Sequence, residues 1–216
     1  MEKHISVLLE ESIDALNLKE NSVVVDCTLG YGGHSSYILK RIKRGYLFAF
    51  DQDSEAIRHS TDRLSAIGTN FTIIKSNFVN LKEELNSRDV EEVDAILFDL
   101  GVSSPQLDEK QRGFSYHEDA KLDMRMDQES TLTAYDVVNK YSKEKLQEIF
   151  YKYGEDKFSK NIAKKIVEYR EQKPIETTLE LVDIIKSAVP MKYRKDKHPA
   201  RQIFQAIRIE VNHELD

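Results

Sequence analysis

The first half of the chain alternates short apolar runs with segments of helical spacing. The apolar runs, rich in β-branched and aromatic residues, predict strands at residues 22–26, 46–50, 71–74 and 93–98. Helical spacing predicts helices before and between these strands, at residues 8–16, 35–43, 55–66 and 81–87. Alternating strands and helices are typical of βαβ units, so we expect an α/β fold with a parallel sheet.

The pattern changes near residue 108. Beyond residue 130 no stretch reads convincingly as a strand. Helical spacing, punctuated by Gly154, Pro174 and Pro190, instead predicts helices at residues 134–140, 143–152, 156–172, 179–187 and 199–215. The second half therefore predicts an all-helical region.

Composition excludes several classes of protein. With 40% hydrophobic and 32% charged residues over 216 positions, the chain suits a soluble globular protein. No apolar run approaches the roughly 20 residues that span a membrane, and the acidic start MEKHISVLLEE does not resemble a signal peptide, so we expect a cytoplasmic protein. The single cysteine, Cys27, rules out an internal disulfide and predicts a small packed side chain.

The charge is unevenly distributed. A net charge of -6 argues against a surface that coats nucleic acid throughout. A local cationic patch nevertheless follows residue 185, and its members are Lys186, Lys192, Arg194, Lys195, Lys197, Arg201 and Arg208. From charge alone, a solvated loop and helix face is the simpler interpretation.

A glycine cluster follows the first predicted strand and opens a helix. The run DCTLGYGGH covers residues 26–34 and contains Gly30, Gly32 and Gly33, and Asp51 ends the second strand, as a ribose-binding acid should. Asp26 at the head of this turn would repel a pyrophosphate but attract the cationic amino-acid end of S-adenosylmethionine. The turn therefore predicts a nucleoside site that favours S-adenosylmethionine over a nicotinamide dinucleotide. Phe78 is a candidate for the adenine face, with core packing as its alternative.

The segment DLGVSSPQLDEKQRGFSYHEDAKLDMRMD, residues 99–127, begins where the fourth strand ends. Asp99 stands at the carboxyl end of that strand, where open α/β sheets bind ligands. Gly101 and the Ser103-Ser104-Pro105 run favour a rigid turn beside it. The structural alternative is a simple loop exit with a capping aspartate.

Motifs in both halves resemble the RsmH (MraW) family of bacterial methyltransferases. The matching runs keep that family's order: HISVLLEE, DCTLGYGGHS, FDLGVSSPQLD, RGFSY, LDMRMD, YGED, IAKKIVEYR and HPARQIFQAIRIEVNHEL. The resemblance implies a class I, Rossmann-like methyltransferase sheet with an inserted helical domain. It places the first four strands in residues 1–108, the inserted domain in 109–200, and a helix returning to the sheet in 201–216. It also implies methylation of the exocyclic N4 of a cytosine in 16S ribosomal RNA of the small subunit.

The same resemblance assigns site residues. It implies that Gly32, Gly33 and His34 hold the methionine end of S-adenosylmethionine and Asp51 its ribose. Phe78, Asp99 and Gln106 would complete the cofactor pocket. No metal is expected.

Cytosine N4 is a poor nucleophile, so catalysis should come from alignment and from acceptors for its amine protons. Asp99, or Ser103 and Ser104 of the following turn, are the candidate acceptors. The base must also leave its stack.

Arginines and aromatics supply the RNA-binding candidates, since guanidinium groups bind phosphates and rings stack on splayed bases. They are Arg112, Phe114, Tyr116, Arg125, Arg201 and Arg208. The structural alternative is that Arg112 and Arg125 brace the loop and that Phe114 is core. Their partners would then be Asp108, Asp119 or Asp123.

The resemblance further implies a strand and an FHSLEDR-like motif beyond Asp216. We therefore expect a truncated sheet with an exposed edge that favours self-association, a homodimer included. Two alternatives to an active methyltransferase stay open at this point: a nicotinamide oxidoreductase, and an inactive or non-catalytic RNA-binding protein derived from the enzyme.

Overall fold

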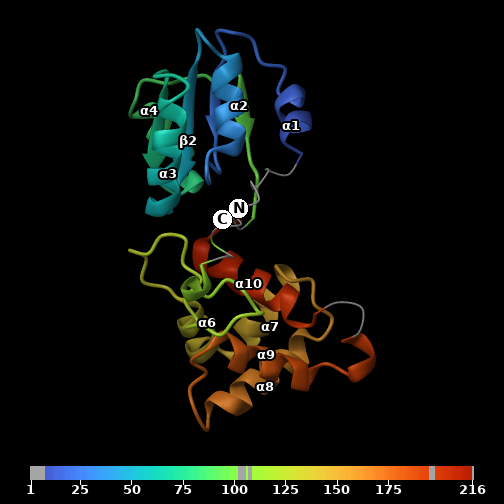
Figure 1. Cartoon of the computed structure of the whole chain (residues 1–216). Helices are drawn as coiled ribbons and strands as arrows, with labels where there is room; N and C mark the ends of the chain where they lie inside the picture. Colours follow the sequence, from blue (N-terminus) through green and yellow to red (C-terminus); the bar gives the residue numbers. More distant parts are fainter. Residues whose placement is uncertain (1–7, 102–105, 107–108, 195–197, 216) are drawn as a thin grey trace. The chain divides into compact units, whose positions relative to one another are not determined.

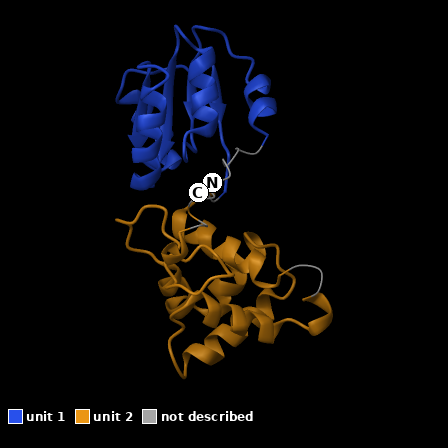
Figure 2. Ribbon diagram, viewed as in Figure 1, with its two compact units in different colours: residues 1–103 blue, residues 104–216 orange. Residues whose placement is uncertain are grey.

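The computed structural model describes residues 8–101, 106, 109–194 and 198–215. The chain forms two compact units, residues 1–103 and 104–216 (Figure 2). The first contains the sheet and the second is helical (Figure 1). The division at residues 108 and 200 stays a proposal. In the structure the helix predicted at 199–215 packs inside the second unit.

The first unit is built on a parallel sheet of four strands in the order β3-β2-β1-β4. The strands are β1 Val23–Asp26, β2 Tyr46–Asp51, β3 Phe71–Lys75 and β4 Ala95–Leu97. Each lies within one or two residues of its predicted position. The predicted α/β class is confirmed.

Helices cover both faces of this sheet because alternate strand residues point to opposite sides. Val24 packs with α1 Leu9–Ala15, α2 Gly33–Arg41 and α3 Ser54–Ser65. The next residue, Val25, faces the opposite side and packs with α4 Leu81–Asn86. Cys27 lies in this second core at 2% exposure, as predicted, and burial raises the pKa of its thiol to about 12.

β4 is an edge strand of the described sheet. Ile96 and Phe98 on and after β4 keep 41% and 49% of their surface exposed. The expected exposed edge is therefore present in the described sheet, and its self-association stays a prediction. In the described part of the chain, no helix has the length and apolar character needed to cross a membrane.

Within the described residues of the second unit, five helices pack against one another. They are α6 Ala134–Lys140, α7 Lys143–Lys152, α8 Ser159–Arg170, α9 Thr178–Ala188 and α10 Ala200–Asn212, with single 3-10 turns at Lys110–Arg112 and Met191–Tyr193. Capping boxes start α6 and α9, where Thr133 and Thr177 each exchange hydrogen bonds with the acid three residues later. α10 contacts α6, α7 and α9. Its residues Ile203, Ala206 and Ile207 are fully buried because one face is continuously apolar.

Candidate functional site

The strand order locates the candidate site in the first unit. From β1 the chain runs through α2 to β2 on one side, whereas β4 pairs with β1 on the other. Ligands of open α/β sheets bind at such a switch point, outside the carboxyl ends of the strands. Asp26 ends β1, Asp51 ends β2 and Asp99 follows β4. The three aspartates therefore stand at the same edge of the sheet.

The glycine turn between β1 and α2 is held by the elements around it. Gly30 and Gly32 have φ angles of 51° and 74°, in the left-handed region that glycine adopts without strain. The carbonyl of Gly30 accepts a hydrogen bond from Ser60 Oγ of α3 at 2.6 Å. The N–H of Leu29 donates to the carbonyl of Phe50 at 2.9 Å, which ties the turn to β2. These contacts to α3 and β2 fix the conformation of the turn.

Asp51 joins this turn from the end of β2. Its Oδ2 accepts the N–H of Gly30 at 2.8 Å and its Oδ1 accepts the N–H of Asp53 at 2.8 Å. Burial raises the pKa of Asp51 to about 6, and these hydrogen bonds only partly oppose the shift. Each carboxylate oxygen has more than one lone pair, so Asp51 can accept further hydrogen bonds from hydroxyl groups.

Asp26 is the most buried of the three carboxylates, at 1% exposure. Its Oδ2 accepts Ser35 Oγ of α2 at 2.6 Å, and its Oδ1 accepts the N–H of Thr28 at 3.1 Å. Burial raises the pKa of Asp26 and the two hydrogen bonds lower it. The observed contacts join β1 to α2. The expected attraction to a cationic cofactor stays a prediction.

Asp99 is the accessible carboxylate, with 47% of its side chain exposed. Its Oδ2 lies 3.7 Å from Nδ1 of His34, which is 5% exposed. The Nε2 atom of His34 is buried without a hydrogen-bond partner among the described residues. The backbone N–H of Asp99 donates to Thr28 Oγ1 at 2.7 Å. Sequence reasoning missed Thr28, although a hydroxyl two residues beyond a strand and beside the glycine turn is a detectable signal.

The remaining predicted pocket residues divide between the two units. Phe78 is half-buried against the α4 face of the sheet, with its ring edge-to-face with Phe98 at 5.5 Å between centroids. The structure shows its packing role, and the adenine role stays a prediction. Gln106 is 8% exposed and belongs to the second unit. The candidate catalytic residues Ser103 and Ser104 lie outside the described residues.

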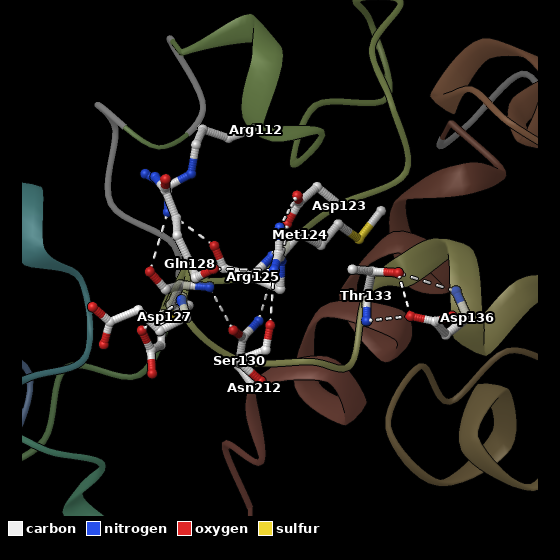
Figure 3. Close-up of polar contacts among 12 residues, drawn as sticks. Arg112, Asp123, Met124, Arg125, Asp127, Gln128, Ser130, Thr133, Asp136 and Asn212 are labelled. Carbon is white, nitrogen blue, oxygen red and sulfur yellow. Dashed lines mark hydrogen bonds and ion pairs between the residues drawn. The ribbon is translucent and has the colours of Figure 1, made fainter.

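Two of the predicted RNA-binding arginines brace a loop of the second unit (Figure 3). Arg112 is 9% exposed and donates to the carbonyls of Arg125 and Met126 at 2.9 and 3.2 Å. Arg125 forms a bidentate pair with Asp123 at 2.8 and 2.7 Å and donates to two further carbonyls. Phe114, at 6% exposure, is core. Arg125 thus braces the loop through the expected Asp123, whereas Arg112 does so through main-chain carbonyls and Glu109, and Asp108 lies outside the described residues. The RNA roles of Arg112, Phe114 and Arg125 stay predictions.

Exposure separates the two predicted arginines of α10. Arg208 is bidentate to the buried Glu214 at 2.8 and 3.0 Å. Arg201 is exposed in the first turn of the helix. Tyr116 stacks on His198 with 4.8 Å between centroids and an interplanar angle of 18°. Of the cationic patch, Lys195 and Lys197 lie outside the described residues.

The glycine turn, the acid that ends β2 and the switch point in the strand order define a Rossmann-like unit of the type that binds nucleoside cofactors. The sequence matches the model of the MraW methylase family over residues 1–216. Ribosomal RNA small subunit methyltransferase H of Exiguobacterium sibiricum is 58% identical over 217 residues, which are all of this chain and 70% of that protein. The crystal structure of an rRNA methylase from Streptococcus thermophilus aligns with 56% of this chain and 70% of its own, at 25% identity and a TM-score of 0.39. The chain belongs to the MraW methylase family.

Proposed function

We propose that this chain is an S-adenosylmethionine-dependent methyltransferase that modifies the exocyclic N4 of a cytosine in small-subunit ribosomal RNA. The observation that supports it most directly is the fixed glycine turn with Asp51 bonded to it, in a chain of the MraW methylase family. The 58% identical relative is by name a small-subunit ribosomal RNA methyltransferase. The cytosine N4 target is what the resemblance to the RsmH (MraW) family implies.

The residues present fit S-adenosylmethionine. A Cβ built on Gly32 would be 3.4 Å from Ser60 Oγ and would not clash, so the positive φ of 74° is what requires glycine there. Asp51 has lone pairs for the two ribose hydroxyls. Gly32, Gly33 and His34 would face the methionine end and Phe78 the adenine. Bound there, the cofactor supplies an electrophilic methyl group on a sulfonium.

Asp99 is our candidate for the residue that acts on the nucleophile. An exposed carboxylate after β4 can accept hydrogen bonds from an exocyclic amine and turn its lone pair toward the methyl group. The amine proton leaves after methyl transfer, so Asp99 need not be a strong base. Its main contribution is orientation.

On the RNA side, our candidates are Arg201, which is exposed, and Tyr116, which is half-buried. An exposed guanidinium suits a phosphate and a stacked ring suits an unpaired base. Arg112, Arg125 and Arg208 contribute instead to the stability of the helical unit. The proposed partner is the small ribosomal subunit or its RNA.

The experiment that tests this function joins binding to product analysis. The chain is titrated calorimetrically with S-adenosylmethionine, then incubated with the methyl-labelled cofactor and small subunits that lack the modification, and the digested RNA is analysed for N4-methylcytidine. We expect micromolar binding and labelled N4-methylcytidine. Asp51→Asn, which keeps the side-chain shape, should lose the binding.

The outcomes separate the alternatives. Binding of RNA with no methyl transfer at saturating cofactor would favour a non-catalytic RNA-binding protein. A label on another atom of the base would refute the N4 assignment while leaving methyl transfer in place. Tighter binding of NADH than of S-adenosylmethionine would contradict the proposal as a whole.

A further inference from the structure

Two residues of the glycine-turn region contact Asp99, and each holds a different part of it. Thr28 Oγ1 accepts the backbone N–H of Asp99 at 2.7 Å. His34 Nδ1 lies 3.7 Å from the carboxylate Oδ2. The hydrogen bond to Thr28 fixes the main chain just after β4, and His34 lies beside the carboxylate of Asp99. Both contacts cross from the β1 side of the switch point to the β4 side.

The Thr28 hydroxyl is itself held in place. The N–H of Thr28 donates to the buried Oδ1 of Asp26 at 3.1 Å, and the N–H of Cys27 donates to the carbonyl of Leu97 at 2.9 Å. β1 and β4 are adjacent and parallel up to the pair Asp26 and Leu97. The hydrogen bond to Thr28 thus fixes the backbone of Asp99, which lies just beyond the last paired residue of β4.

His34 approaches from the first turn of α2, where its side chain is buried. Its Nε2 has no hydrogen-bond partner in the described part of the chain. Its Nδ1 is the ring nitrogen that lies near the carboxylate of Asp99. Asp26 and Asp99 are the charged groups with which it interacts electrostatically. A ring fixed by packing keeps its Nδ1 3.7 Å from the Asp99 carboxylate, which is an ion-pair distance and not a hydrogen bond.

We propose that Thr28 and His34 form a two-point clamp on Asp99 and act as positioning residues for methyl transfer. The catalytic consequence rests on the proposed function, whereas the clamp itself is a property of the ligand-free chain. Asp99 needs such a clamp because it is exposed and the next described residues, Leu100 and Gly101, are exposed as well. A carboxylate that moves by about 1 Å aligns the amine poorly, which costs roughly a hundredfold in rate at the extreme.

The first part of the test does not depend on activity. Hydrogen exchange of the Asp99 amide is followed by nitrogen-15 NMR in the wild type, Thr28→Val and Thr28→Ser. Valine keeps the shape but removes the acceptor, so we expect exchange about five- to tenfold faster than in the wild type, and serine should restore most of the protection. Thr72→Val is the matched control, since it deletes a hydroxyl that contacts Tyr46 Oη at 2.9 Å on β3, away from the site.

The second part measures kcat and the KM for S-adenosylmethionine. Asparagine places an amide nitrogen near the position of the imidazole Nδ1, and glutamine places one near Nε2. We therefore expect His34→Asn to retain more of kcat than His34→Gln, and Thr28→Val to lose about tenfold in kcat with a smaller change in KM. A purely structural role would lower the unfolding temperature of the variants without this difference between Asn and Gln.

Each result supports or overturns a stated claim. Equal exchange of the Asp99 amide in Thr28→Val and wild type would overturn the clamp whatever the activity. Faster exchange with unchanged kcat would overturn the positioning role alone. A wild type with a protected amide that neither binds S-adenosylmethionine nor transfers its methyl group would refute the proposed function, and the clamp would remain as a structural feature.

Discussion

The environment of Asp51 makes a quantitative prediction about pH and nucleoside binding. Burial raises the pKa of this carboxyl from the ordinary 3.8 to about 6. At pH 7.5 the group is ionised and can accept hydrogen bonds from both ribose hydroxyls. At pH 5 only about one chain in eleven has the ionised group, because the pKa lies one unit higher. A ligand that needs the carboxylate then binds about tenfold more weakly, or by about 1.4 kcal/mol.

The free chain should show the opposite trend in stability. A carboxyl whose pKa is raised by folding stabilises the fold at low pH, and that contribution is lost as pH rises through the folded-state pKa. For Asp51 the change from pH 5 to pH 7.5 amounts to about 1.4 kcal/mol of lost stability. Affinity therefore rises while stability falls over the same interval. This is the cost of keeping a partly buried charge ready for the ligand.

Calorimetric titration with 5′-methylthioadenosine at pH 5, 6 and 7.5 measures the effect. This probe carries the ribose but neither the sulfonium nor the amino acid, so its own charges do not change in that range. Asp51→Asn should bind weakly and lose the roughly tenfold rise in affinity between pH 5 and pH 7.5, and Asp14→Asn, an exposed aspartate on α1, should keep that rise. The same rise in wild type and Asp51→Asn, or an affinity that rises as the pH falls, would refute the reasoning.

Three further predictions concern single residues. Gly32→Ala should cost about 1–2 kcal/mol of stability because φ is 74° there, and weaken S-adenosylmethionine binding, measured by urea unfolding and calorimetry. Arg112→Ala should lower the stability of the helical unit by about 3 kcal/mol, since two loop carbonyls lose a charged donor, without changing cofactor affinity. Arg201→Ala should weaken RNA binding and reduce the slope of log affinity against log salt by about one, whereas Arg208→Ala should lower stability by about 2 kcal/mol and leave that slope unchanged. Equal salt slopes for the two variants would contradict our separation of surface and structural arginines.

The sheet was predictable because its signals are local. Each strand is a short apolar run, and each is separated from the next by a helix long enough for a parallel connection. The glycine turn and Asp51 were predictable for the same reason, because a positive φ needs glycine and a ribose acid follows the second strand at a regular spacing.

The sequence left the choice between RNA-binding and loop-bracing arginines open, because their contacts depend on backbone reversals at residues other than glycine. Met124 is fully buried with a φ of 60°, which turns the chain so that the side chains of Asp123 and Arg125 meet. His213 has a φ of 52° at the end of α10, and this lets Glu214 fold back onto Arg208. Residues other than glycine rarely adopt positive φ angles, and no residue type in the sequence predicts where they occur. A count of charges therefore does not distinguish the arginines that hold the helical unit together from the exposed Arg201.

The contacts of Asp99 were missed for a different reason. Thr28 and Asp99 are 71 positions apart, and only the pairing of β1 with β4 brings them together. Neither the sequence around Thr28 nor the sequence around Asp99 predicts that β1 and β4 are neighbours in the sheet. Once the strand order is known, the residues that follow neighbouring strands can be recognised as possible partners.

The three aspartates at the carboxyl edge show how environment assigns different tasks to the same side chain. Asp26 is buried and both of its oxygens are bonded to β1 and α2 neighbours, so we assign it to the architecture of the turn. Asp51 is partly buried with a raised pKa and lone pairs to spare, which suits hydroxyl groups of a bound nucleoside. Asp99 is exposed and fixed from one side, which suits an incoming amine. The exposure of the carboxylate thus increases from Asp26, which supports the turn, to Asp51, which would bind the cofactor, and to Asp99, which would meet the RNA base.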